Sequence, residues 1–297
     1  MNGTPAQGVH SLGGKLRRMD ERGGELTSPD TVIETIKAEL EKASPSRRRR
    51  ILEAIALAAL GSIPWVGGVL SVTAAFKFDE ADAHADSLRN QWLKEHQLKL
   101  GELRSTLDQI FSRLDGLGEQ IDARIESEAY LLLVRKTFRQ WDQADTEEKR
   151  RLLVNLITNA AGTRAASDDI VRLFLDWIDS YHEAHFAVVR HIFKNPGPTK
   201  YDIWLGVYGE PVPRDDSAEA DLYKMLIRDL TLGGVIRQPR ESDADGRFRK
   251  KTTPARRTSA SHTLESPFED TKQYVLTELG KQFVSYTMNE LVSRLEA

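Results

Sequence analysis

Two histidines on a predicted helix are the closest approach in this chain to a metal-binding motif. They stand in the stretch His182-Glu183-Ala184-His185, three residues apart. The zinc protease motif places two histidines four residues apart with a glutamate between them, so that both imidazoles reach one metal ion. The spacing here is one residue short, and no third ligand is evident. We therefore expect no metal ion, and we expect these side chains to lie on a polar helix surface.

Other patterns that carry catalysis or bind phosphate are missing from the sequence. It contains no G-x-x-x-x-G-K-[ST] phosphate loop and no G-x-S-x-G nucleophile elbow. The acidic pairs Asp168-Asp169 and Asp215-Asp216 stand where helices commonly begin. With no cysteine, the chain has no disulfide scaffold, thiolate zinc site, iron–sulfur cluster or cysteine nucleophile. An enzyme is therefore disfavoured, and no cofactor is expected.

A basic cluster lies in a polar stretch near the C-terminus, GRFRKKTTPARR. Its cations are Arg247, Arg249, Lys250, Lys251, Arg256 and Arg257. Such a cluster could bind nucleic acid or acidic lipid through charge alone, and the alternative is a solvated loop. Nucleic acid is the disfavoured partner, because a neighbouring predicted helix over 218–232 carries three carboxylates against two cations.

A long run with a single charge follows four consecutive arginines, and only Glu53 is charged between Ile51 and Phe76. One helix of this length would measure about 39 Å, which exceeds the roughly 30 Å hydrocarbon core of a bilayer. Pro64, with glycines on both sides of it, predicts a kink or a hairpin within the run. The arms of such a hairpin would be too short to cross a bilayer singly.

Two interpretations of this run remain open. In the first, the run is a conditional membrane segment that resembles the apolar hairpins of α-helical pore-forming toxins. In the second, it is a helical hairpin buried in the protein. On the first interpretation, the residues that bind anionic headgroups are Arg47, Arg48, Arg49 and Arg50. The membrane-inserting residues are then Ile51, Ile55, Leu57, Leu60, Ile63, Trp65, Val66, Val69, Leu70, Val72 and Phe76.

A heptad-like pattern follows in a long helix that we expect over 79–145. The pattern, which we call the heptad seam, consists of Leu100, Leu103, Leu107, Ile110, Leu114, Leu117 and Ile121. Alternating spacings of three and four are typical of a coiled coil, which would join copies of the chain. The alternative is an amphipathic helix that packs on its own domain. Gly101, Gly116 and Gly118 weaken a continuous helix, since each costs about 1 kcal/mol relative to alanine.

The last hundred residues predict a helix, a strand, a second strand and a closing helix. The first helix covers 218–232, with Leu222, Met225, Leu226 and Leu230 facing inward, and Gly233-Gly234 ends it. Strands at 235–236 and 274–276 flank the polar insert 238–271, and Thr277 caps the closing helix. This order of elements is typical of a winged helix.

The same region resembles a known bacterial family. The stretches LIRDLTLGGVI and YVLTELGKQFVSY resemble the winged-helix tail of bacterial abortive-infection alpha-type proteins. Upstream, EEKRRLLVNLITNAA and FLDWIDSYHEAHFAVVRHIF are similar to the helices that precede that tail. The resemblance covers about residues 146–297 and implies a role in defence against phage.

We therefore expect a mainly α protein with four regions. They are a disordered N-terminus (1–28), a helix plus an apolar membrane-type segment (29–76), a long helical or coiled-coil region (77–145), and a helical domain (146–297) ending in a winged helix (218–297). The expected function is an abortive-infection effector that moves from the cytoplasm to the inner membrane, oligomerises and disrupts the membrane after a partner protein activates it. The alternative is a soluble adaptor or nucleic-acid-binding regulator.

Overall fold

The computed structural model describes residues 47–66, 83–163, 165–239, 268 and 272–289, and of residues 47–49, 52 and 83–95 it describes the backbone alone. The described chain is mainly helical, as the sequence predicts. The expected disordered N-terminus and the segment 29–46 lie outside the described residues, as does most of the polar insert 238–271.

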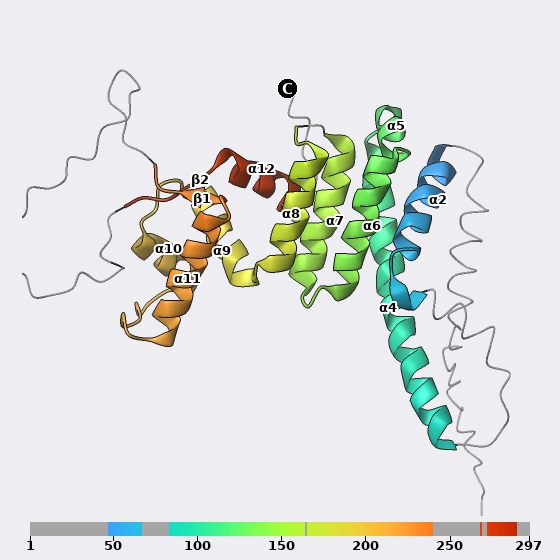
Figure 1. The fold of residues 1–297 in the computed structure, drawn as a ribbon, viewed down its shortest axis with the longest axis horizontal. Helices are drawn as coiled ribbons and strands as arrows, with labels where there is room; N and C mark the ends of the chain where they lie inside the picture. Colours follow the sequence, from blue (N-terminus) through green and yellow to red (C-terminus); the bar gives the residue numbers. More distant parts are fainter. Residues whose placement is uncertain (1–46, 67–82, 164, 240–267, 269–271, 290–297) are drawn as a thin grey trace, which may run out of the picture.

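The N-terminal part of the described chain is a bundle of helices that lie side by side (Figure 1). Its long helices are α2 (Arg47–Leu60), α4 (Ala83–Gly116), α6 (Glu128–Gln143), α7 (Glu147–Gly162) and α8 (Asp168–Ser180). Helix α7 is central, because it packs against α4, α6, α8 and the closing helix α12 (Glu278–Thr287). Every residue from Leu152 to Ala161 is buried. Helix α2 is peripheral and packs against α4, α6 and the short helix α5 (Asp122–Ile125).

The continuous helix expected over 79–145 is not observed, and that expectation is wrong. Helix α4 ends at Gly116, and Gly118 adopts a φ of 77°, in the left-handed region that favours glycine. A short 3₁₀ helix, η1 (Glu119–Ile121), and α5 follow. The side chain of Ser127 then caps α6 by accepting a hydrogen bond from a peptide N–H in its first turn. The chain therefore reverses direction at the top of the bundle (Figure 1).

The heptad seam is buried inside the single chain. Its members Leu100, Leu103, Leu107, Ile110, Leu114 and Ile121 are each at most 4% exposed, and Leu117 is partly buried against the same core. Helix α4 packs here against α7 and α2. The arrangement is that of an amphipathic helix packed on its own domain. The role in joining copies of the chain requires a different arrangement of α4 and stays a prediction.

A second group of helices follows the bundle, made of α9 (Glu183–Lys194), α10 (Lys200–Tyr208) and α11 (Ala218–Leu232). After α11, strand β1 (Ile236–Arg237) pairs antiparallel with β2 (Val275–Leu276), so that Ile236 lies opposite Leu276. Thr277 caps α12, because its hydroxyl accepts a hydrogen bond from the Gly280 N–H at 2.9 Å. The predicted order of helix, strand, strand and capped helix is confirmed.

The inward face predicted for α11 is partly wrong. Leu226 and Leu230 are buried, but Leu222 is 49% exposed and Met225 is only half-buried. Tyr223 takes an inward position instead, because its hydroxyl donates a hydrogen bond to the Lys200 carbonyl at 2.6 Å and leaves no unpaired polar atom in the core. The buried face of α11 is thus rotated away from Leu222.

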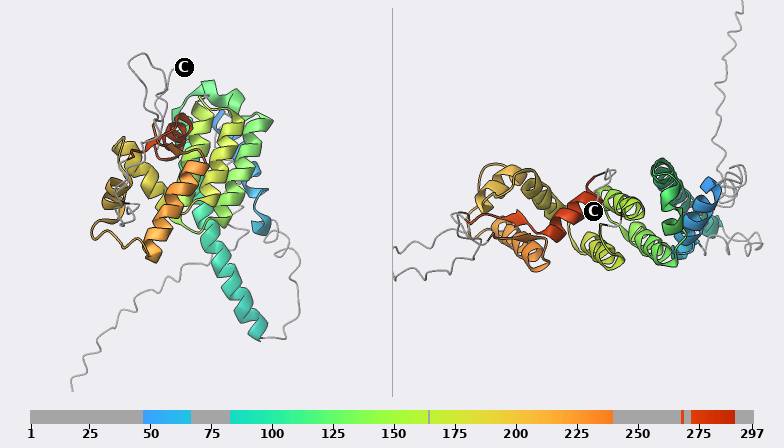
Figure 2. Two further views of the ribbon diagram at one scale, coloured as in Figure 1. Left: turned by 60° about the vertical axis from the view of Figure 1, so that its left-hand side comes forward. Right: turned by 90° about the horizontal axis from the view of Figure 1, so that it is seen from above.

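Helix α12 connects the two groups of helices (Figure 2). Two buried asparagines of α7 hold its carboxyl end: Asn155 Nδ2 donates to the Thr287 carbonyl at 2.8 Å, and Asn159 Nδ2 donates to the Tyr286 carbonyl at 2.9 Å. The last carbonyls of a helix have no partner within it, so these amides satisfy groups that would otherwise be buried unpaired. Asn155 Oδ1 also accepts a hydrogen bond from Arg113 Nη1 of α4 at 2.6 Å.

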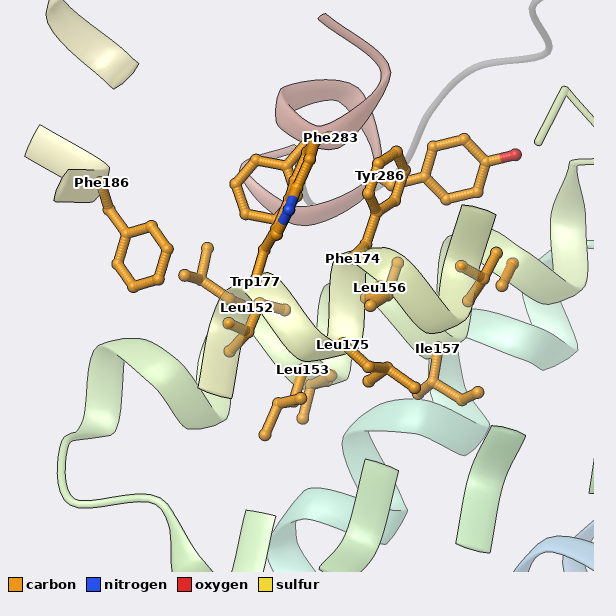
Figure 3. Close-up of a cluster of buried hydrophobic side chains, with 14 of the residues drawn as sticks. Leu152, Leu153, Leu156, Ile157, Phe174, Leu175, Trp177, Phe186, Phe283 and Tyr286 are labelled. Carbon is orange, nitrogen blue, oxygen red and sulfur yellow. The ribbon is translucent and has the colours of Figure 1, made fainter. Parts of the chain in front are cut away.

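An aromatic cluster surrounds this contact (Figure 3). Phe283 of α12 meets Phe174 and Trp177 of α8 edge to face, with ring centroids 5.5 and 5.4 Å apart. Edge-to-face pairs of this kind stabilise a core by about 0.5–1.5 kcal/mol beyond the burial of their area. The core continues across residue 145, where the sequence predicted a domain boundary, because α6 packs against both α7 and α8.

Replacing Asn159 with alanine should destabilise the protein. The Asn159→Ala variant leaves the Tyr286 carbonyl without its amide partner in a buried position, which costs about 1–3 kcal/mol. Urea unfolding followed by circular dichroism measures this loss. The matched control is Asn195→Ala, which removes an exposed bond from Asn195 Nδ2 to the His191 carbonyl and should cost less than about 0.5 kcal/mol. Equal losses for the two variants would contradict the assigned role of Asn159.

Candidate functional site

The inner face of α2 and of the turn that follows it carries apolar residues at helical spacing. Ile51, Ile55, Ala59, Ile63 and Val66 are each at most 5% exposed. They belong to the same hydrophobic core as the neighbouring helices α4, α5 and α6, against which α2 packs. Full burial of an isoleucine or valine side chain stabilises a fold by about 1.5–3 kcal/mol. Apolar contact is therefore the main force that holds α2 in place.

A single tryptophan adds the best-defined polar contact of this segment. The Trp65 indole Nε1 donates a hydrogen bond to Asp142 Oδ1, at the end of α6, at 2.6 Å. The same ring meets His96 of α4 edge to face at 5.2 Å, and the Lys99 ammonium lies 6.0 Å from its centroid. Trp65 thus joins the end of the α2 segment to both α4 and α6.

From Ala54 onward, the outer face of α2 is also apolar. Leu57 is 72% exposed, and Ala54 and Leu60 are half-buried. No charged residue occurs from Ala54 to Val66. A surface helix of a globular protein usually carries charged or polar residues on the face opposite the core. The part of α2 from Ala54 onward therefore differs from an ordinary surface helix, because its outer face carries no charge, whereas Arg50 and Glu53 lie on the same face in the first half of the helix.

Of the four arginines at the start of α2, the structure describes the side chain of Arg50, which makes only a weak ion pair. Arg50 Nε lies 3.8 Å from Glu126 Oε1, and the two side chains are 66% and 46% exposed. An exposed pair of this kind contributes between 0 and about 1 kcal/mol. The side chains of residues 47–49 lie outside the described residues. The binding of headgroups by Arg47, Arg48, Arg49 and Arg50 stays a prediction.

The structure divides the membrane-inserting residues predicted from the sequence into four sets. Ile51, Ile55, Ile63 and Val66 are buried, Leu60 and Trp65 are partly buried and Leu57 is exposed, while Val69, Leu70, Val72 and Phe76 lie outside the described residues. Helix α2 has 14 residues, which corresponds to about 21 Å and is shorter than the roughly 30 Å hydrocarbon core. In the described part of the chain, no helix combines the length and the apolar character needed to cross a bilayer.

The histidine pair lies at the start of α9, and the predicted polar surface is wrong for His185. This side chain is only 3% exposed; its Nδ1 accepts a hydrogen bond from the His182 backbone N–H at 3.1 Å, and its ring stacks on Tyr181. Its Nε2 lies 3.9 Å from Asp229 Oδ2, which is too far for a hydrogen bond. Burial lowers the pKa of His185. Within the described ranges, no three His, Asp or Glu side chains are grouped to hold a metal ion.

An open hollow of about 380 Å³ lies between the start of α6 and the start of α8. Arg124 and Asp168 line the hollow and form a bidentate ion pair, in which Arg124 Nη1 lies 3.1 Å from Asp168 Oδ2. The hydrogen bonds from Arg124 lower the pKa of the Asp168 carboxyl. Ser127 and Ser167 also line the hollow, and their side chains cap α6 and α8. These polar groups all serve the fold, so the hollow is not assigned as a site.

The basic cluster of the polar insert, Arg247, Arg249, Lys250, Lys251, Arg256 and Arg257, lies outside the described residues. Its contact with nucleic acid or lipid stays a prediction. Comparison of the chain with known protein families, with curated proteins and with solved structures finds no match. The exposed Leu57 and the uncharged stretch from Ala54 to Val66 are features of the described chain that packing within the fold does not require.

The buried His185 should make the stability of the protein depend on pH. Its pKa is lowered in the folded state, so the unfolded chain binds more protons once the pH falls through about 6.5, the ordinary histidine pKa. The free energy of unfolding should therefore decrease between pH 7.5 and 5.5, by at most about 1.4 kcal/mol per pH unit for one proton. Urea unfolding at several pH values measures this slope. His185→Phe should reduce the slope, and an unchanged slope would contradict the assignment.

Proposed function

We propose that this chain is a bacterial defence effector of the abortive-infection type, which disrupts the inner membrane after a partner protein releases α2. The observation that supports the proposal is that α2 is peripheral in the bundle and that its segment is uncharged from Ala54 to Val66, with Leu57 72% exposed. Apolar side chains exposed to water, such as that of Leu57, are more stable in an apolar environment such as lipid.

The packing of α2 favours a membrane segment that inserts only after its release over one that spans the membrane permanently. In the folded chain the inner face of α2 is buried against α4, α5 and α6, so a dormant protein hides most of its apolar surface. On release, this face becomes available to lipid, and the uncharged sequence continues beyond Val66 to Phe76. We propose that the whole run 51–76 enters the bilayer and that the arginines at 47–50 hold anionic headgroups. Each cation near an anionic surface contributes about 1 kcal/mol.

In the proposed mechanism, the release of α2 also allows copies of the chain to associate. Helix α2 covers part of α4, which carries the heptad seam, and α4 also packs against α7. When α2 leaves, apolar side chains of α4 lose their partner on that side. We propose that a second copy of the chain then pairs with this part of the seam as a coiled coil, because a/d positions can pack across two chains as they do within one.

The C-terminal region supplies the regulatory part of the proposal. We propose that α11, β1, β2 and α12 form a winged helix related to the tail of abortive-infection alpha-type proteins. The order of these elements and the antiparallel pairing of Ile236 with Leu276 support this. The proposed mechanism needs no cofactor and no catalytic group. The protein would stay in the cytoplasm until a partner engages this region.

The alternative function, a soluble adaptor, is favoured by one observation. Leu222 and Leu232 on the outside of α11 are 49% and 79% exposed, which suits contact with another protein. An adaptor would keep α2 packed permanently and would not act on membranes. The following experiment separates the two functions.

Weakening the contact of Trp65 should increase membrane disruption. Trp65→Phe keeps an aromatic ring but removes the indole N–H and with it the hydrogen bond to Asp142, which costs about 1 kcal/mol and raises the released population roughly fivefold. Leakage of a dye from vesicles of phosphatidylethanolamine and phosphatidylglycerol measures the effect. Adding Leu57→Arg should abolish the leakage, because an arginine at the bilayer centre costs about 2.5–3.5 kcal/mol. Because Leu57 is exposed in the folded chain, the Leu57→Arg substitution should leave the free energy of unfolding unchanged.

The matched control places the same charge outside the apolar segment. Leu132 of α6 is 46% exposed, so Trp65→Phe with Leu132→Arg should leak dye as Trp65→Phe does alone. Urea unfolding of each variant verifies that the fold is retained. The adaptor function is the correct one if none of the variants releases dye at any ratio of protein to lipid.

A further inference from the structure

The outside of α11 carries an apolar stripe that faces away from the core. Leu222 and Leu232 are 49% and 79% exposed, and Met225 is half-buried. At 100° per residue, these three positions fall within about 80° of one another and opposite the buried Tyr223 and Ile227, and Asp229 falls on the same face between Met225 and Leu232. We call Leu222, Met225 and Leu232 the outer stripe. Single exposed leucines are common on protein surfaces, whereas apolar residues aligned on one outer helix face are typical of an interaction site.

Carboxylates dominate the surface around the outer stripe. Between residues 214 and 232 the chain carries five carboxylates, Asp215, Asp216, Glu219, Asp221 and Asp229, against three cations, Arg214, Lys224 and Arg228. Each of these cations already contacts a carboxylate of its own chain. Lys224 Nζ lies 2.6 Å from Asp215 Oδ1, and Arg228 Nε lies 3.4 Å from Asp229 Oδ1. The rim of the stripe therefore presents a net negative charge to an approaching partner.

This combination of charge and apolar area selects among possible partners. DNA is disfavoured, because its phosphates would meet carboxylates at the helix that a winged helix usually presents to the duplex. Pairing of α11 with a second copy of itself is disfavoured as well, since acidic rims would face each other. An amphipathic helix is the partner that fits best. Its apolar side chains at positions i, i+3, i+4 and i+7 form a row of a length comparable to that of the outer stripe.

We propose that the outer stripe of α11 docks a basic amphipathic helix that belongs to a partner protein. Its apolar anchors contact Leu222, Met225 and Leu232, and its lysines or arginines pair with the surrounding carboxylates. This docking does not depend on the membrane activity proposed above, because α2 packs on the opposite part of the fold, against α4, α5 and α6. A protein that never acts on membranes would still bind such a helix.

Two labelled peptides test the proposal directly. One is a helical peptide with leucines at i, i+3, i+4 and i+7 and lysines at its other positions, and its analogue carries glutamates in place of the lysines. Fluorescence anisotropy measures the binding of each peptide to the full chain. The lysine peptide should bind at least about tenfold more tightly, and the difference should shrink between about 0.05 and 0.3 M salt as the charges are screened.

Substitutions on the outer stripe test its location. Leu232→Glu and the double variant with Leu222→Glu should each weaken binding of the lysine peptide at least threefold, and the double variant more than the single one. Both leucines are exposed, so the variants should unfold at the same urea concentration as the parent protein. Leu132→Glu of α6 is the matched control, because Leu132 is 46% exposed and lies in the bundle; it should leave peptide binding unchanged.

Four results would overturn the proposal. The first is equal binding of the two peptides, and the second is binding that the outer-stripe substitutions do not weaken. The third is tight binding of duplex DNA that the same substitutions abolish, which would assign the surface to nucleic acid. The fourth is much tighter peptide binding after Arg247, Arg249, Lys250 and Lys251 are neutralised, which would show that this chain's own basic cluster occupies the surface.

Discussion

Helix α7 is enclosed by α4, α6, α8 and α12, so its polar side chains must find partners inside the protein. A buried amide without a hydrogen bond costs about 1–3 kcal/mol, and Asn155 and Asn159 avoid this cost by donating to the carboxyl end of α12. The same requirement draws Arg113 of α4 to Asn155. These hydrogen bonds are directional, so they specify where α4 and α12 lie on α7, which the nondirectional contact of leucines and phenylalanines cannot do alone.

The position of α2 at the edge of the bundle follows from the central position of α7. Helix α6 packs against α7 and α8 as well as against α2, whereas the main contacts of α7 are with α4, α6, α8 and α12. The hydrogen bond of Trp65 to Asp142 is the best-defined polar contact of the α2 segment, whereas α12 is held by several. Local stability varies within a fold, and the apolar burial of Ile51, Ile55 and Ile63 is what a partner must overcome to release the α2 segment. A releasable α2 on a stable core is the physical basis of the proposed membrane activity.

The two groups of helices differ in the charge of their exposed apolar surfaces. The α2 segment is uncharged from Ala54 to Val66, whereas the outside of α11 combines exposed leucines with an excess of carboxylates. An uncharged apolar surface has affinity for lipid, but an apolar surface with an acidic rim disfavours anionic lipid and favours a basic protein segment. In the two proposals, the surfaces therefore have different partners: a protein at α11 and a membrane at α2.

The sequence by itself determined the elements whose signals are local. The Thr277 cap, the helix over 218–232 and the two strands follow from residues within one or two turns. The tertiary structure decided which apolar faces meet. The spacing of the heptad seam suits a second chain and α7 equally well, and only the reversal of the chain after Gly116 places α7 beside it. Burial of His185 and exposure of Leu222 likewise depend on α9 packing against α11, a contact between residues that periodicity along one helix cannot specify.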